Sequence, residues 1–129
     1  MYRTLLILII CAQLFGCAPL ALTALGVGAS SGVSHTLSGI TYRTFTEPMS
    51  RVKTASLKAL SRMQINVSSA DKIEGGEEIK AFSGDREINI ELETISPSTT
   101  RMRVTAKKNI FLYDSATSTE IILQTEKYL

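Results

Sequence analysis

Hydrophobic residues recur with two different periods after residue 35, and these periods predict strands and one long helix. Thr36 to Phe45 alternates and is rich in β-branched and aromatic residues, which predicts a strand with Thr41 and Arg43 on one face and Tyr42 on the other. Met49 to Met63 follows a proline and repeats its apolar residues at helical spacing. The expected buried stripe of this helix is Met49, Val52, Ser56, Ala59, Leu60 and Met63.

A β-hairpin gives the clearest signal in the chain. Ser83-Gly84-Asp85-Arg86 predicts a two-residue turn, because Gly84 can take the positive φ that the favoured hairpin turns require. Pairing Ser83 with Arg86 sets Ala81 opposite Ile88 and Ile79 opposite Ile90, so the apolar residues share one face. A short strand over 65–67 and a loop over 71–76 are expected before this hairpin.

A further strand follows Ser96-Pro97-Ser98, with Met102 and Val104 alternating with charged residues. A five-residue connection would put Glu93 opposite Arg103 and form an acid–base ladder on a face turned to water. Asp114 or Ser115 is expected to cap a last helix that runs through Leu129. The expected buried stripe of that helix is Ile121, Ile122, Thr125, Tyr128 and Leu129.

These elements predict an α+β fold. The expected form is a small antiparallel sheet with two helices packed on one face, in the order β-α-β-β-β-α, because the sheet has one apolar and one charged face. The length of 129 residues suits one domain, placed at 36–129.

The first 35 residues have a different composition. Arg3 precedes an apolar run of the length that export signals use. Leu14-Phe15-Gly16-Cys17 resembles the lipobox of bacterial lipoproteins, which predicts a signal peptide over 1–16 and a lipid on Cys17. Residues 17–35 then form a spacer rich in Gly, Ala and Ser. The alternative is an uncleaved membrane anchor, because Leu5 to Val33 carries no charge.

Composition excludes several function classes. Hydrophobic residues make up 44% and charged residues 20%, as in globular proteins. The net charge is +2, and residues 1–16 contribute only Arg3 to it, so the chain lacks the basic excess of a nucleic-acid binder. No cofactor is expected, because Gly26-x-Gly28 is too short and wrongly placed for a nucleotide loop.

Candidate chemistry is sparse. His35 is the single histidine and stands at the edge of the spacer, so neither a metal site nor a Ser-His-Asp triad is expected. Glu91 and Glu93 alternate on an outer strand face, where no cleft would adapt them to acid–base catalysis. We therefore expect no catalytic residues and no enzyme.

A cluster of basic residues on the first helix is the best candidate contact surface. Its members, Arg51, Lys53, Lys58 and Arg62, lie off the apolar stripe, and no acidic residue stands between Glu47 and Asp71. The cluster is either a solvated helix face or a contact for anionic lipid, lipopolysaccharide phosphates or an acidic envelope protein.

The whole chain resembles domain of unknown function 3568, a family of small uncharacterised bacterial lipoproteins. The features that carry this resemblance are the lipobox, the spacer, Tyr42, Glu47-Pro48-Met49-Ser50-Arg51-Val52, Ala55, Ala59-Leu60, the Gly84 hairpin and the helix after Phe111. The resemblance implies an envelope location facing the periplasm and no catalytic residues. Ala18 after the acylated cysteine implies sorting to the outer membrane in preference to the inner one.

Two functions follow as hypotheses. The first is a non-enzymatic interaction or structural module of the envelope, held to the membrane through Cys17. The alternative is a carrier or sensor that binds a small apolar or lipid ligand between helices and sheet. A cavity lined by Met49, Leu60, Met63 and Ile90 would favour the carrier, whereas a filled core with an exposed apolar patch would favour the module.

Overall fold

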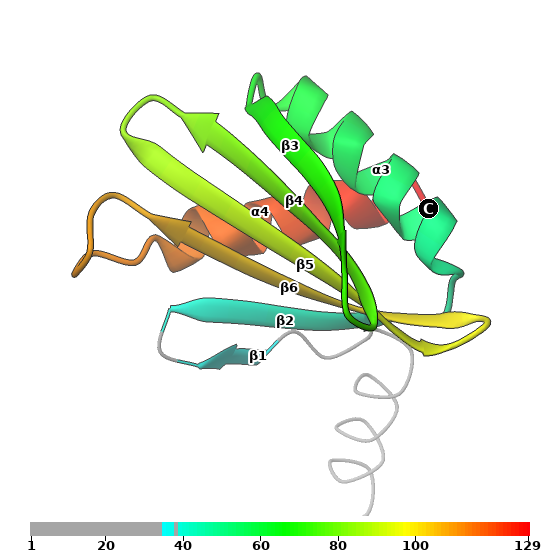
Figure 1. Ribbon diagram of the computed structural model, residues 1–129. Helices are drawn as coiled ribbons and strands as arrows, with labels where there is room; N and C mark the ends of the chain where they lie inside the picture. The colour runs from blue at the N-terminus through cyan, green and yellow to red at the C-terminus, as the bar shows by residue number, and fades with distance from the viewer. Residues whose placement is uncertain (1–34, 38) are drawn as a thin grey trace, which may run out of the picture. The chain divides into compact units, whose positions relative to one another are not determined.

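The fold of this chain is a mixed α+β domain, as the sequence predicts. A computed structural model describes residues 35–37 and 39–129 (Figure 1). The expected signal peptide, Cys17 and the spacer up to Ser34 lie outside these residues. The elements are β1 (His35–Leu37), β2 (Ile40–Phe45), α3 (Met49–Arg62), β3 (Asn66–Ile73), β4 (Gly76–Ser83), β5 (Arg86–Ser96), β6 (Thr99–Lys107) and α4 (Ser115–Glu126).

The strands form one antiparallel sheet in the order β1-β2-β6-β5-β4-β3. α3 contacts β3, β5 and β6, α4 contacts β2 and β6, and the two helices contact each other. Figure 1 shows α4 behind the sheet as drawn and α3 next to β3. No helix in the described part of the chain is long and apolar enough to cross a membrane.

The core lies where the apolar residues of the strands meet the helices. Alternate residues of β5 and β6 are buried, and the buried stripe of α3 packs against them. The buried cluster comprises Phe45, Val52, Leu60, Ile65, Ile79, Ala81, Ile88, Ile90, Leu92, Met102, Val104, Ala106, Ile121 and Ile122. Met49 and Met63, at the ends of the predicted α3 stripe, are partly buried against it.

The predicted hairpin is confirmed. Ser83 pairs with Arg86, Ala81 with Ile88 and Ile79 with Ile90. Gly84 has a φ of +60°, the left-handed region for which glycine is favoured. Turn chemistry and hydrophobic alternation therefore set the same register here.

The register predicted for the next pair of strands is wrong by two residues. Glu93 pairs with Arg101, and Arg103 pairs with Glu91. The connection is a two-residue turn between Ser96 and Thr99, and a β-bulge lies just before it. Because a bulge absorbs one extra residue in one strand, a short turn keeps the apolar sets on one face without the five-residue loop.

The predicted order β-α-β-β-β-α is also wrong, because two strands precede α3 and four strands, not three, lie between α3 and α4. Residues 36–45 form two strands joined by a turn at Gly39, which has a φ of +81°. β3 runs through the first part of the expected 71–76 loop and pairs with β4 up to Ile73 and Gly76. His35 opens β1 opposite Tyr42 and so belongs to the sheet rather than to the spacer.

Both helices start close to the predicted positions. Pro48 precedes α3, and the Asp114 carboxylate caps α4 by accepting a hydrogen bond from the Thr117 amide at 3.0 Å. The buried residues of α4 are Ser118, Ile121, Ile122 and Thr125. Tyr128 lies beyond the helix and is 41% exposed, so its place in the buried stripe was wrongly predicted.

Candidate functional site

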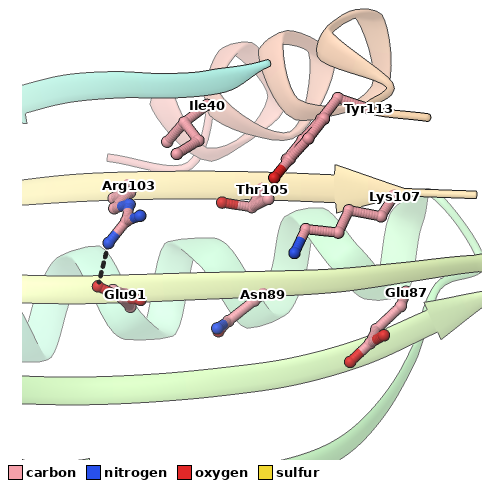
Figure 2. A pocket seen from close by; sticks show the side chains of 8 residues that line it. All are labelled: Ile40, Glu87, Asn89, Glu91, Arg103, Thr105, Lys107 and Tyr113. Atoms are coloured by element: carbon pink, nitrogen blue, oxygen red, sulfur yellow. Dashed lines mark hydrogen bonds and ion pairs between the residues drawn. The ribbon is translucent and has the colours of Figure 1, made fainter. Parts of the chain in front are cut away.

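The residues that alternate with the core positions of β5 and β6 form a polar groove (Figure 2). The groove has a volume of about 180 Å³. It is lined by Ile40, Glu87, Asn89, Glu91, Arg103, Thr105, Lys107 and Tyr113. These side chains come from three strands and from the segment between β6 and α4, so the groove depends on the sheet register described above.

Two of the four charged side chains of the groove, Glu91 and Arg103, are paired with each other. Arg103 donates to Glu91 at 3.1 Å, and its guanidinium lies 5.8 Å from the centre of the Tyr42 ring. Asn89 donates to Glu78 at 2.9 Å. On the neighbouring ladder position Arg101 forms an ion pair with Glu93. This arrangement is the acid–base ladder expected from the sequence, in the corrected register, and exposed pairs of this kind stabilise a sheet only weakly.

Two of the four basic residues predicted on the first helix are held by carboxylates. Arg51 donates to Glu47 at 2.8 Å and to the carbonyl oxygen of Leu129 at 2.7 Å. Lys53 forms an ion pair with Glu77 of β4. The positive charge of the helix is therefore partly neutralised within the domain.

The other two basic residues, Lys58 and Arg62, are exposed and have no carboxylate partner among the described residues. Arg51, Lys58 and Arg62 follow one another at spacings of seven and four, so they share one side of α3. Lys53 lies on a different side. The structure thus places three of the four predicted residues along one stripe and separates the fourth.

A site that the sequence analysis missed is the β6–α4 loop, residues 108–113. Four consecutive apolar side chains point to solvent there: Ile110 is 83% exposed, Phe111 87%, Leu112 56% and Tyr113 45%. One feature of the sequence could have indicated this site. The apolar run 110–113 follows two lysines, and it fits neither the alternation of the preceding strand nor the helical spacing of the last helix. Such contiguous exposed apolar residues mark contact surfaces in soluble domains.

Hydrogen bonds give the β6–α4 loop a defined backbone. The Asn109 side-chain oxygen accepts from the amides of Phe111 and Leu112, both at 2.9 Å. The Lys108 amide donates to the Leu112 carbonyl at 2.9 Å, and the Asp114 amide donates to the Ala106 carbonyl at 2.8 Å. Asn109 thus stabilises the turn at whose tip the apolar side chains are exposed.

Two further contacts fix the C-terminal side of the loop. The amide and hydroxyl of Thr117 donate to the Asp114 carboxylate, and Arg86 donates to it at 2.5 Å. These donors lower the pKa of Asp114 from 3.8 to about 2.

The β1–β2 turn packs against Tyr113 at Gly39. A Cβ on Gly39 would lie 2.3 Å from the Tyr113 Cβ, so this close approach requires glycine.

A second groove, of about 370 Å³, lies between this loop and the Gly84 hairpin. Exposed Phe82 and Ile110 provide its apolar part. Its charged lining residues are Asp85, Arg86, Glu87, Lys107 and Lys108. The hairpin turn and the β6–α4 loop therefore form one end of the sheet, where apolar and charged side chains are mixed.

Two further points of the sequence analysis concern lipidation and metal binding. Cys17, the expected lipidation site, lies outside the described residues. Within residues 35–37 and 39–129, no group of three or more His, Cys, Asp or Glu side chains is placed to hold a metal ion.

Comparison with known proteins addresses the resemblance noted in the sequence. The model of the family described as "Protein of unknown function (DUF3568)" matches residues 1–125. No curated protein matches the chain. Because the family match covers nearly all of the sequence, from the N-terminal segment into α4, the chain belongs to the DUF3568 family.

Proposed function

We propose that this protein is a membrane-anchored lipoprotein of the bacterial cell envelope whose domain acts as a non-enzymatic interaction module. Lipid on Cys17 holds it to a membrane, with the domain facing the periplasm. The lipobox-like sequence Leu14 to Cys17 supports the anchor. Ala18 supports the outer membrane over the inner one.

The observation that carries the module hypothesis is the exposed apolar tip of the β6–α4 loop. Ile110 and Phe111 leave more than four fifths of their surface in contact with solvent. Contiguous apolar exposure of this kind is unusual in a domain that meets only water, and it is common where a second surface covers it. The hydrogen bonds of Asn109 hold the tip in a fixed form, so a partner would meet a preformed loop.

The carrier alternative has less support. It requires space between the helices and the sheet, beside Leu60 and Ile90. Both residues have no exposed surface, and Met49 and Met63 pack against the same core cluster. The two grooves described above are lined by other residues and lie outside this core.

The basic side of α3 is a second candidate contact, as the sequence analysis proposed. Lys58 and Arg62 are available to anionic lipid or an acidic envelope protein, whereas Arg51 and Lys53 are engaged by Glu47 and Glu77. An electrostatic contact through two free charges is weaker than one through four. The apolar loop is therefore the stronger candidate.

Metabolic labelling tests the anchor. Wild-type protein should incorporate radioactive palmitate in bacterial cells, and Cys17→Ser should incorporate none and remain as the longer precursor. Cys11→Ser is the matched control, because Cys11 lies within the expected signal peptide. Equal labelling of the wild type and Cys17→Ser would refute the lipoprotein proposal.

Site-specific photo-crosslinking in intact cells tests the module. A photoreactive amino acid replaces Phe111 in one variant and Ile95 in another, since Ile95 is also exposed, at 51%, but lies near the end of β5. We expect crosslinks to envelope components, lipid or protein, at position 111 in clear excess over position 95. Equal yields at the two positions would show that the loop is not a contact surface.

A further inference from the structure

We propose that the β6–α4 loop inserts its apolar tip, Ile110 and Phe111, among the headgroups and upper acyl chains of a phospholipid surface that contains anionic lipid. Lys107, at the end of β6, and Lys108 then contact the lipid phosphates. This inference deepens the proposed function by naming the partner of the exposed loop. It rests on the domain being tethered near a membrane.

The side chains of the loop match an interfacial position in the bilayer. Ile110, Phe111 and Leu112 are apolar, and Tyr113 is an aromatic residue with a polar end, the type enriched at the level of the headgroups. The two largest exposures in the domain's set of exposed hydrophobic residues belong to adjacent positions at the tip, Ile110 and Phe111. Covering them by acyl chains removes apolar surface from water without any change in the core.

The backbone of the tip is prepared for an environment poor in water. Unsatisfied amides and carbonyls are costly in lipid, and this cost normally keeps irregular loops out of membranes. Here the Phe111 and Leu112 amides donate to the Asn109 side chain, and the Leu112 carbonyl accepts from the Lys108 amide. Three backbone groups of the tip therefore have hydrogen-bond partners within the loop and would keep them in lipid.

The charges on the loop favour a negatively charged surface, such as lipid phosphates, over an apolar protein pocket. Lys107 and Lys108 precede the tip, and no acidic residue occurs from 107 to 113. Neither lysine forms an ion pair with a carboxylate of the described residues, although Lys107 lies 5.3 Å from the centre of the Tyr113 ring. Lysine can keep its ammonium at the headgroups while its carbon chain lies along apolar surface.

The nearby acidic residues that the structure describes form no ion pair with these lysines. Asp114 is engaged by Arg86 and Thr117. Glu87 lies opposite Lys107 in the sheet, and Asp85 and Glu87 line the same groove as the two lysines, so Lys108, next to the tip in sequence, is the main phosphate contact of the loop. Lys108 of the loop and Lys107 at the end of β6 place two positive charges beside the apolar residues. This combination of an apolar element and adjacent lysines is what binds membrane interfaces without crossing them.

The tether brings the loop to such a surface. If Cys17 carries lipid, residues 17–34 can span at most about 65 Å even when fully extended. The domain is then confined near the bilayer at high effective concentration, where a weak contact is populated. A protruding loop of four apolar residues suits a soft lipid surface, which needs no complementary pocket.

The chain contains no tryptophan, so one introduced tryptophan reports on its own position. The full chain with Phe111→Trp is reconstituted into vesicles of phosphatidylethanolamine and phosphatidylglycerol whose acyl chains carry bromine as a quencher. We expect the emission to shift to shorter wavelength and to be quenched. Tyr128→Trp is the matched control, since Tyr128 is also an exposed aromatic residue, after α4, and should remain unquenched.

A second pair of variants tests the lysine contact in the Phe111→Trp background. Lys108→Glu should lower the ratio of inserted to free loop by at least about fivefold, as expected from ~1 kcal/mol for each charge near an anionic surface. Lys58→Glu makes the same change at an exposed position of α3 and should leave quenching unaltered. Lack of quenching at Phe111→Trp, equal quenching at Tyr128→Trp, or equal effects of the two charge reversals would overturn the inference.

These outcomes are separable from failure of the proposed function. Tryptophan quenching measures the depth of the loop whatever holds the chain to the vesicle, and palmitate labelling measures the anchor alone. Protein crosslinks at position 111 together with an unquenched tryptophan would retain the interaction module and refute the lipid contact.

Discussion

Helix α3 and the β6–α4 loop both combine apolar and basic residues, but they arrange them in opposite ways. In α3 the apolar stripe faces the sheet, with Val52 and Leu60 fully buried, and the basic residues face outward. In the loop the apolar side chains of Ile110 and Phe111 face outward. The apolar residues of the helix therefore contribute to the core, whereas those of the loop can bind a partner.

The two regions also differ in what happens to their positive charges. Glu47, just before α3, pairs with Arg51, and Glu77 of β4 pairs with Lys53. Lys107 and Lys108 form no ion pair with a carboxylate of the described residues, although Glu87 lies opposite Lys107, whose ammonium is over the Tyr113 ring. A cluster of basic residues in sequence is therefore a weaker indication of an anionic contact than lysines whose neighbours leave them unpaired.

The largest expected effect is a difference in stability between a variant of a buried apolar residue and a variant of an exposed one. Leu60→Ala should lower the free energy of unfolding by about 2–5 kcal/mol, because it opens a cavity in a filled core. Phe111→Ala should change it by less than about 0.5 kcal/mol, because the side chain is exposed. Urea denaturation followed by circular dichroism measures both. Similar losses for the two variants would mean that the loop packs against the domain and is not a free tip.

The fold was predictable where two local signals agreed. The hairpin register followed from Gly84 together with the alternation of Ile79 and Ala81 with Ile88 and Ile90. β3 was underestimated because its side chains are almost all exposed, so pairing with β4 holds it rather than a hydrophobic pattern. The bulge before Ser96 could not be predicted, because one extra residue in a strand has no characteristic residue type or spacing.

The next expected effect concerns Asp114, which links the loop to α4. Asp114→Ala should cost about 1 kcal/mol of stability, because it removes the helix cap as well as the partner of Arg86. The pKa of Asp114 is lowered to about 2 from 3.8, so the unfolded chain binds a proton at higher pH than the folded chain. This stabilisation is therefore complete above about pH 4 and is lost as the pH falls towards 2.

Asp114→Asn is the matched control for this titration. Its side-chain oxygen can still accept from the Thr117 amide, but it carries no charge for Arg86. We expect its stability to lie between the wild type and Asp114→Ala, and its unfolding free energy to vary less between pH 4 and pH 2. A wild type and Asp114→Asn with the same acid dependence would assign the titration to other carboxylates.

The candidate site was predictable only in part, for a physical reason. The basic residues of α3 stood out because their spacing is local, but pairing of Lys53 with Glu77 joins elements far apart in the chain. The β6–α4 loop was missed because an apolar run is normally interpreted as core. Its exposure depends on Asn109, which turns the chain away from the sheet.

A smaller effect tests the pairing of charges on α3. Lys53→Met should cost about 1 kcal/mol, because it leaves the Glu77 carboxylate, whose side chain is only 12% exposed, without its partner. Lys58→Met should have almost no effect, since Lys58 is exposed and unpaired among the described residues. Thermal unfolding of the two variants gives the comparison. Equal melting temperatures would show that the Lys53–Glu77 pair contributes nothing.

The smallest expected effect tests whether the free charges of α3 contribute to membrane contact. Lys58→Glu combined with Arg62→Glu should change the free energy of unfolding by less than about 0.5 kcal/mol, because both side chains are exposed on the side of the helix away from its buried stripe. In the Phe111→Trp background the same double reversal should leave quenching by brominated lipid unchanged, since the loop and not the helix meets the bilayer. Salt provides the internal check: the Debye length falls from about 10 Å at 0.1 M to about 3 Å at 1 M, so any contact made only by charge weakens over that range. Insertion of Phe111→Trp should persist at 1 M salt through its apolar part. If the double reversal lowers quenching as much as Lys108→Glu does, the helix takes part in the contact and the distinction between the two regions fails.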